Sequence, residues 1–74
     1  MPRFYFHVMD GTAFIDTDGV ELPDIAAARR LAAITAGQTL AQIGDRFWEG
    51  KPWRLYVADE VGSVVVSLVF QSES

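Results

Sequence analysis

Three carboxylates lie close together in the first third of the chain. Asp16, Asp18 and Glu21 surround a glycine. Carboxylate oxygens are ligands that Ca²⁺ prefers, but a calcium-binding loop of about twelve residues ends in a bidentate glutamate, and this segment lacks both the spacing and that glutamate. Aspartates in turns usually accept hydrogen bonds from their own backbone. The spacing therefore predicts turn-forming carboxylates and no metal site, and Asp10 and Asp59 take the same interpretation.

His7 is the only histidine, and it lies in a segment with an alternating pattern. Its imidazole would suit ligand binding or pH sensing on an open sheet face. One histidine does not make a zinc site, which takes three or four protein ligands, unless carboxylates lie nearby. The pattern favours the simpler interpretation, a surface or interface histidine that is hydrogen-bonded to a residue of a neighbouring strand.

The hydroxyl side chains are not arranged as a catalytic nucleophile. None of them lies in a Gly-x-Ser-x-Gly turn, and the glycines form no phosphate-binding loop. The chain has no cysteine, which excludes disulfides and thiolate chemistry. We therefore expect no catalytic activity and no bound cofactor. The hydroxyl residues considered are Thr12, Thr17, Thr35, Thr39, Ser63 and Ser67.

Both ends of the chain alternate with a period of two residues, which is typical of β-strands. Asp10-Gly11 suits a type I′ hairpin turn, and Glu60-Val61-Gly62 suits a turn with a bulge. We expect strands at 3–9, 12–16, 53–59 and 63–70. The sets expected on one side of these strands are Phe4, Phe6 and Val8, then Trp53, Leu55 and Val57, then Val64, Val66, Leu68 and Phe70.

The middle of the chain has the spacing of a helix. Leu22 precedes a proline and is expected to be extended, and Asp24 is a good N-cap. Gly44 is the expected end of the helix. Small side chains dominate the stripe expected to face the sheet, so we expect the helix to lie close to it. The stripe is Ile25, Ala28, Ala32, Ala36, Leu40 and Ile43.

These elements predict an α+β fold of the ββαββ type, a four-stranded antiparallel sheet with one helix packed on one face. Residues 45–52 are expected to be a loop in which Phe47 and Trp48 fold back over the end of the core. The predicted core consists of Phe4, Phe6, Val8, Ile25, Ala28, Ala32, Ala36, Leu40, Ile43, Leu55, Val57, Val64, Val66 and Leu68.

The length of 74 residues is that of one domain, and half of the residues are apolar. The formal charge of −4 disfavours strong non-specific binding to a phosphate backbone. No apolar run approaches the ~18 residues of a membrane-spanning helix, and the beginning of the chain lacks the pattern of a signal peptide. We expect one cytoplasmic domain over residues 1–74, with a frayed tail at 71–74.

The most distinctive parts of the sequence are the string Met1-Pro2-Arg3-Phe4-Tyr5-Phe6-His7 and the segment Gly19-Val20-Glu21-Leu22-Pro23-Asp24. Together with Asp10-Gly11, Asp59-Glu60-Val61-Gly62 and Ser67-Leu68-Val69-Phe70, they resemble a family of short bacterial proteins of unknown function. The resemblance covers nearly the whole chain. Because that family has no assigned activity, the resemblance implies none here.

The chain departs from that family on the outer side of the helix. Members usually carry charged residues there, where this chain has Leu31 and Ile34. The departure predicts an additional apolar patch. A hairpin followed by an aspartate-capped, alanine-rich helix is also similar to antitoxin-type domains, as a likeness of pattern only.

The sheet face that points away from the helix is the strongest candidate for an interaction surface. A solvated face would alternate with charged residues, whereas this face is apolar and aromatic with two polar groups. A contiguous apolar patch on a small domain tends to mark an interface. The candidate residues are Tyr5, His7, Met9, Arg54, Tyr56, Val65 and Val69 on the sheet, and Leu31 and Ile34 on the helix.

Two functions compete for this surface. In the first, the domain self-associates across a two-fold axis, through the sheet face or the helix side, or binds another protein. In the second, Tyr5 and Tyr56 stack on the bases of a single-stranded nucleic acid while Arg54 lies near a phosphate. The acidic charge and the absence of a basic rim argue against the second function. We predict a homodimeric protein-interaction module, with a nucleic-acid-associated regulator as the alternative.

Overall fold

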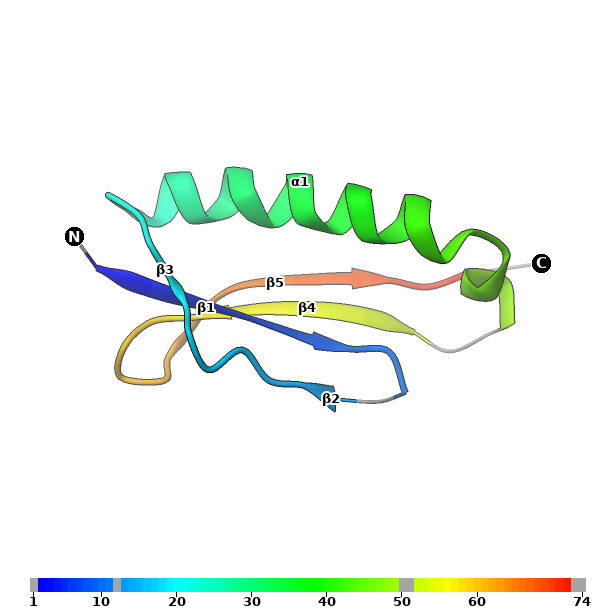
Figure 1. Cartoon of the computed structure of the whole chain (residues 1–74), viewed down its shortest axis with the longest axis horizontal. Coiled ribbons are helices and arrows are strands. Elements are labelled where there is room, and N and C mark those ends of the chain that lie inside the picture. Colours follow the sequence, from blue (N-terminus) through cyan, green and yellow to red (C-terminus); the bar gives the residue numbers. More distant parts are fainter. Residues whose placement is uncertain (1, 12, 50–51, 73–74) are drawn as a thin grey trace.

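The computed structural model describes residues 2–11, 13–49 and 52–72 of the chain. One long helix lies along one face of an antiparallel β-sheet, and a short 3-10 helix follows it (Figure 1). The protein is therefore α+β, as its sequence predicts. The elements in chain order are β1 (Arg3–Met9), β2 (Ala13–Phe14), β3 (Val20–Glu21), α1 (Ile25–Ile43), the 3-10 helix η1 (Gly44–Glu49), β4 (Trp53–Ala58) and β5 (Val64–Phe70).

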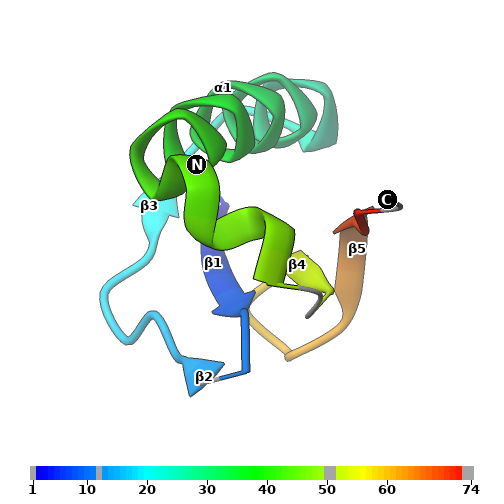
Figure 2. The same cartoon turned by 90° about the vertical axis from the view of Figure 1, so that its right-hand side faces the viewer.

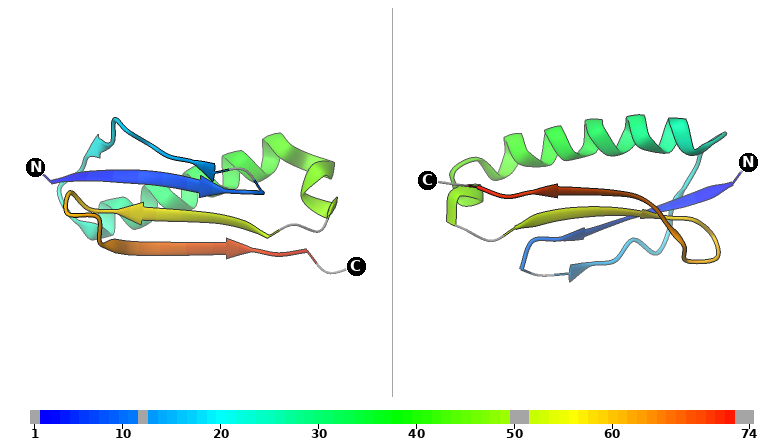
Figure 3. Two further views of the ribbon diagram at one scale, coloured as in Figure 1. Left: turned by 90° about the horizontal axis from the view of Figure 1, so that it is seen from below. Right: turned by 180° about the vertical axis from the view of Figure 1, so that it is seen from behind.

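The sheet has five strands within the described residues. The order is β2-β1-β4-β5, and β3 pairs with β1 on the side where β2 also lies (Figures 2 and 3). The four-stranded ββαββ arrangement predicted from the sequence is wrong in this respect. The Val20–Glu21 segment, expected as an extended connection, pairs with Arg3 and Phe4 and forms the fifth strand.

The first hairpin is looser than the predicted type I′ turn. Met9 pairs with Ala13, so the connection comprises residues 10–12 rather than the two central residues of a tight turn. The return strand expected at 12–16 is reduced to the two residues of β2. Thr12 lies outside the described residues.

The alternation in β1 and β4 sends one set of side chains under the helix, as predicted. Phe4 and Leu55 are 3% and 0% exposed, whereas Tyr5 and Tyr56 lie on the opposite face. Trp53, which the predicted core omitted, is also buried. The buried core consists of Phe4, Ala28, Ala32, Ala36, Trp53, Leu55 and Val57, and Phe6, Val8, Leu22, Ile43, Phe47, Val65, Val66, Leu68 and Phe70 pack against it.

Two residues of the predicted core are exposed. Ile25, in the first turn of α1, lines an open groove and is 44% exposed. Val64 is 58% exposed because the pairing of β4 with β5 is irregular at its beginning. Val57 pairs with Val66, but the next residue, Ala58, pairs with Val64. Val65 is the extra residue of a β-bulge. Val64, which precedes it, therefore faces the side of the sheet opposite to the one that the alternation predicts.

Helix α1 begins and ends where the sequence predicts. The Asp24 carboxylate accepts a hydrogen bond of 2.8 Å from the backbone N–H of Ala27, and the N–H of Gly44 donates to the carbonyl of Leu40 at the other end. The residues that bury most completely are alanines, with Ala28 and Ala32 both 0% exposed. Small side chains let the helix axis approach the sheet, so a larger residue at these positions would push the two layers apart.

The segment after the helix is more regular than expected. Residues 44–49 form η1 rather than a loop, and residues 50–51 of the predicted loop lie outside the described residues. Phe47 packs against the core as predicted, but Trp48 is 62% exposed, and the two rings meet edge to face at 5.7 Å. Of the predicted frayed tail, residues 71–72 have no regular secondary structure and residues 73–74 lie outside the described part.

Within the described residues, no helix combines the length and the apolar character needed to cross a membrane.

Candidate interaction surface

Cross-strand pairing arranges the face away from α1 in three rows across β1, β4 and β5. We call these nine residues the outer sheet face. Only one of them, Arg54, carries a full charge at neutral pH. The rows are Met9–Arg54–Val69, His7–Tyr56–Ser67 and Tyr5–Ala58–Val64.

The β4–β5 half of the outer sheet face is the more accessible half. Val64 and Val69 are 58% and 53% exposed, and Arg54 and Ser67 are also exposed. Tyr56 is half-buried, and its hydroxyl accepts a hydrogen bond of 3.2 Å from the Arg54 guanidinium. This contact orients the Arg54 guanidinium across Tyr56. None of the nine residues is acidic, so no carboxylate lies opposite the guanidinium in these rows.

The β1 half is occupied by the connection between β2 and β3. His7, predicted to bond a neighbouring strand residue, accepts a hydrogen bond at Nδ1 from the backbone N–H of Asp16, at 3.1 Å. This contact requires an unprotonated Nδ1, so any hydrogen bond that the imidazole donates must come from Nε2. His7 therefore helps to hold the connection in place rather than standing free on the surface.

The Asp16 carboxylate accepts a hydrogen bond from an N–H group of β1 where no neighbouring strand in the described part of the chain supplies a backbone carbonyl. Its Oδ2 accepts from the N–H of Phe6 at 3.1 Å, and its Oδ1 accepts from the N–H groups of Asp18 at 3.0 Å and Gly19 at 3.1 Å. Burial by itself would raise the pKa of Asp16, but the hydrogen bonds from three backbone donors outweigh burial and hold the pKa of this carboxyl below its ordinary value. The interpretation of Asp16 as a turn former is confirmed.

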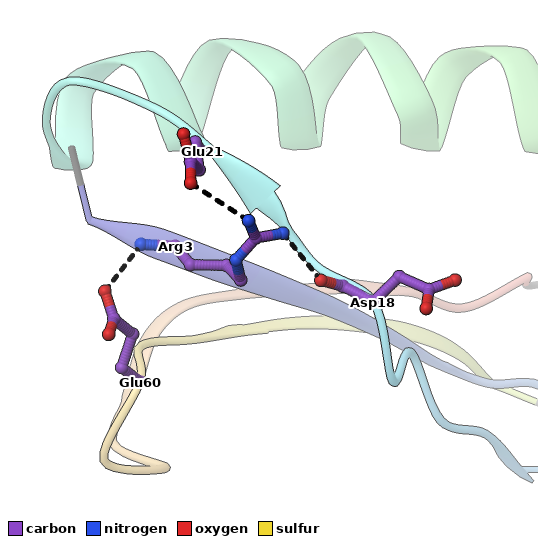
Figure 4. Close-up of polar contacts among 4 residues, drawn as sticks. All are labelled: Arg3, Asp18, Glu21 and Glu60. Atoms are coloured by element: carbon purple, nitrogen blue, oxygen red, sulfur yellow. Dashed lines mark hydrogen bonds and ion pairs between the residues drawn. The ribbon is translucent and has the colours of Figure 1, made fainter.

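Arg3 ties the beginning of β1 to three other segments (Figure 4). Its guanidinium donates to the carbonyl oxygen of Asp18 at 2.8 Å and forms an ion pair with the Glu21 carboxylate at 3.0 Å. Its backbone N–H donates to Glu60 Oε1 at 2.9 Å. Both charged groups of the ion pair are more than a third exposed, so the pair itself contributes little, and its value lies in fixing the geometry of the connection.

We expect Gly19→Ala to destabilise the protein more than Gly62→Ala. Both glycines have a positive φ, 73° and 86°, so alanine costs about 1–2 kcal/mol at either position. Around Gly62 a Cβ would meet open space, whereas at Gly19 it would lie 2.7 Å from Cγ of Arg3 and 2.9 Å from Cε2 of Tyr5. Urea denaturation of the two variants measures the difference, and equal losses would contradict this close approach.

A family model described as "Domain of unknown function (DUF6894)" matches residues 3–71. The chain belongs to this family. No curated protein and no solved structure matches it significantly. The DUF6894 match spans every strand and helix of the fold, which supports one domain of unknown function over this range. Because the family has no assigned activity, the role of the outer sheet face must be argued from its geometry.

One predicted interaction residue of this DUF6894 chain was placed on the wrong face. Val65 packs against the core because the bulge turns it toward the helix side, and Val64 takes the outward position instead. Ser67 lies on the outer sheet face, the side that the alternation predicts for it, although it was not among the candidate interaction residues. The run of three valines at 64–66 contains no polar residue that would reveal where the alternation shifts.

The candidate residues on the helix lie apart from the sheet face. Ile34 is 55% exposed and Leu31 is half-buried. The patch is therefore smaller than the outer sheet face, and two exposed arginines, Arg29 and Arg30, precede it on the helix.

An open groove of about 610 Å³ lies between the beginning of α1 and the beginning of β5. Its walls include Phe4, Ile25 and Val65 and are mostly apolar. Its two carboxylates already accept backbone hydrogen bonds, Asp24 at the helix cap and Asp59 in the turn before β5. Among the described residues, no three histidine or acidic side chains are grouped so that they could hold a metal ion.

Proposed function

We propose that this protein is a small self-associating interaction module and that the outer sheet face is its contact surface. The observation that supports the proposal is the composition of this face. The helix covers the other side of the sheet, and of the nine outward residues only Arg54 is fully charged. The remaining acidic and basic residues of a chain with a formal charge of −4 lie elsewhere.

The exposure pattern favours the β4–β5 half as the centre of contact. Val64 and Val69 each leave more than half of their surface exposed, and Tyr56 lies between their rows. Covering apolar surface contributes about 25 cal/mol per Å², and a tyrosine adds a rigid ring with a polar end. A two-fold axis places the same patch on both partners, so a face whose one full charge is Arg54 meets the same face of the second copy.

Tyr56→Glu is expected to halve the mass of the assembly, because it places a charge in the middle of the contact. Interface substitutions of this kind weaken association by about tenfold or more. Light scattering or sedimentation equilibrium over a range of concentrations measures the change. Tyr56→Phe keeps the ring and is the matched control, which should retain the wild-type mass.

Ile34→Glu separates the sheet face from the helix side. Ile34 is exposed on the helix, so the substitution adds the same charge without touching the outer sheet face. If Ile34→Glu halves the mass and Tyr56→Glu does not, the contact lies on the helix. If the wild-type chain is a monomer at every concentration, self-association is refuted and another protein becomes the partner to seek.

The alternative function is association with single-stranded nucleic acid, as an antitoxin-like regulator. The pairing of Arg54 with Tyr56 on an exposed strand favours it, because a guanidinium next to an aromatic ring suits a phosphate and a base. Against it, Arg3 is paired with Glu21, and the ring of Tyr5 lies against Gly19. Binding to a fluorescent oligonucleotide that falls with salt and with Arg54→Ala would favour this alternative over self-association.

A cytoplasmic location and a bacterial origin remain predictions of the sequence.

A further inference from the structure

Strand β5 borders the sheet, and no other described element lies along its outer side (Figure 3). An edge strand leaves every second backbone N–H and C=O without a partner in the sheet. Proteins usually protect such an edge with charged residues, proline or a β-bulge. The sequence of β5 is VVVSLVF, which contains no charged residue and no proline, and its bulge, at Val65, lies at the beginning of the strand. The backbone groups along this edge can therefore form hydrogen bonds with another strand.

The opposite edge of the sheet is blocked. Strands β2 and β3 have only two residues each, and the five residues between them leave the edge instead of continuing it. The Asp16 carboxylate takes up the N–H of Phe6, and Asp18 and Glu21 add negative charge. Because only one edge is open, addition of strands cannot continue from copy to copy. An open edge can pair only with another open edge, which closes the assembly at two copies.

We propose that β5 pairs antiparallel with β5 of a second copy of this chain, across a two-fold axis at Ser67. Ser67 is the middle residue of Val64–Phe70, so this register gives the longest overlap, about 24 Å of strand. Val66 then lies opposite Leu68 of the second copy, and both are on the helix side of their sheets. If the two-fold axis instead passed between two residues, each residue on the helix side of one β5 strand would lie opposite a residue on the outer side of the other.

The β-bulge fits the same register. With Val65 as the extra residue, Val64 lies opposite Val69 of the second copy, and both belong to the outer sheet face. These are the two exposed apolar residues of β5, at 58% and 53%. Pairing would bring these two side chains into contact, and β5 contains no charged residue that pairing could place opposite another. The self-complementarity of the strand is what identifies the second copy as the partner.

This contact is separate from the proposed contact of the outer sheet faces. The two-fold axis runs perpendicular to the sheet, so both helices lie on the same side of one continuous sheet and both outer faces remain open on the other. The edge contact alone joins two copies, and the edge and face contacts together join four. The edge contact does not depend on the face contact being correct.

Ser67→Cys tests the register directly, because the wild-type chain has no cysteine. Residues directly opposite in an antiparallel pair have Cβ atoms about 4.5–5.5 Å apart, close to the separation that a disulfide spans. Ser67 is exposed, so the variant is expected to fold. Under mild oxidation we expect most of the protein to become a disulfide-linked dimer. Because Ser67 also belongs to the outer sheet face, a contact between stacked faces could form the same bond, and the combination with Tyr56→Glu decides between the two contacts.

Ser63→Cys is the matched control. Ser63 is an exposed residue of the turn before β5, four positions from Ser67, and in the proposed register its two copies lie far apart. It should form little disulfide-linked dimer under the same oxidation. Equal yields of linked dimer from Ser63→Cys and Ser67→Cys would overturn the proposal, and so would a mass that grows without limit as concentration rises.

Combining Ser67→Cys with Tyr56→Glu distinguishes the two contacts. A linked dimer that still forms in the double variant supports the edge contact, whether or not Tyr56→Glu changes the mass. Loss of the linked dimer in the double variant would show that the cross-link depended on the outer sheet face, which would overturn the edge contact. A mass halved by Tyr56→Glu, with no linked dimer from Ser67→Cys alone, would leave the face contact standing and refute the edge contact.

Discussion

Leu55→Ala is expected to lower the free energy of unfolding by about 2–5 kcal/mol, because it removes a fully buried side chain and leaves a cavity. Leu55 is 0% exposed and lies in the central strand β4, opposite Val8 on one side and Leu68 on the other. A domain of this length has a total stability of only about 4–11 kcal/mol. The variant should therefore lose a large fraction of the stability of the domain, which urea denaturation followed by circular dichroism would measure.

Val61→Ala is the control for this prediction. Val61 is also apolar, but it is 86% exposed in the turn between β4 and β5 and lies outside both proposed contacts. Its truncation should cost less than about 1 kcal/mol, because surface substitutions remove little buried area. If the two variants were equally mild, Leu55 would not occupy the centre of a packed core.

The parts of the fold that the sequence predicted correctly are those where one period extends over many residues. In β1 and β4, large apolar residues alternate with polar or aromatic ones, so the face of each residue follows from counting. In α1 the cap at Asp24 and the stop at Gly44 are local signals, since each acts within one turn of the helix. Local chemistry therefore fixed the helix bounds and the inward set of the central strands.

Strand β5 shows why the rest was harder to predict. Its first three residues are all valine, so shifting the alternation by one residue leaves the pattern unchanged. The bulge at Val65 arises from the pairing with β4, where Val57 and Ala58 face residues that are two positions apart. That pairing depends on residues of another strand, and no residue next to Val65 in the sequence indicates it. The prediction consequently exchanged Val64 and Val65 between the two faces.

The edge formed by β2 and β3 was missed for a related reason. The sequence indicates a turn around Gly19 and correctly assigns a turn-forming role to Asp16. What it does not reveal is that the same carboxylate reaches Phe6, ten residues earlier, and substitutes for a backbone partner. A side chain that completes a sheet edge leaves no periodic signal, so the strand at Val20–Glu21 was expected only as a connection.

Asp16→Asn is expected to lower the free energy of unfolding by about 1–3 kcal/mol at neutral pH. The carboxylate accepts on both oxygens, from Phe6 on one and from Asp18 and Gly19 on the other. An amide has only one oxygen, so whichever way it turns, its NH₂ group faces at least one backbone N–H. Leaving such a donor without an acceptor costs about this amount. The measurement is urea denaturation at pH 7.

The pH dependence of this loss identifies the carboxylate as its source. Because folding lowers the pKa of Asp16, its contribution is fully present above the ordinary aspartate value of about 4 and is lost as the pH falls through the folded value. The difference between wild type and Asp16→Asn should therefore shrink as the pH is lowered from 6 toward 2. Asp18→Asn is the matched control, because the backbone carbonyl of Asp18 accepts from Arg3 and its N–H donates to Asp16, while its carboxylate takes no part in these contacts. A pH-independent loss in Asp16→Asn, or an equal loss in Asp18→Asn, would show that the negative charge of Asp16 does not hold this edge of the sheet.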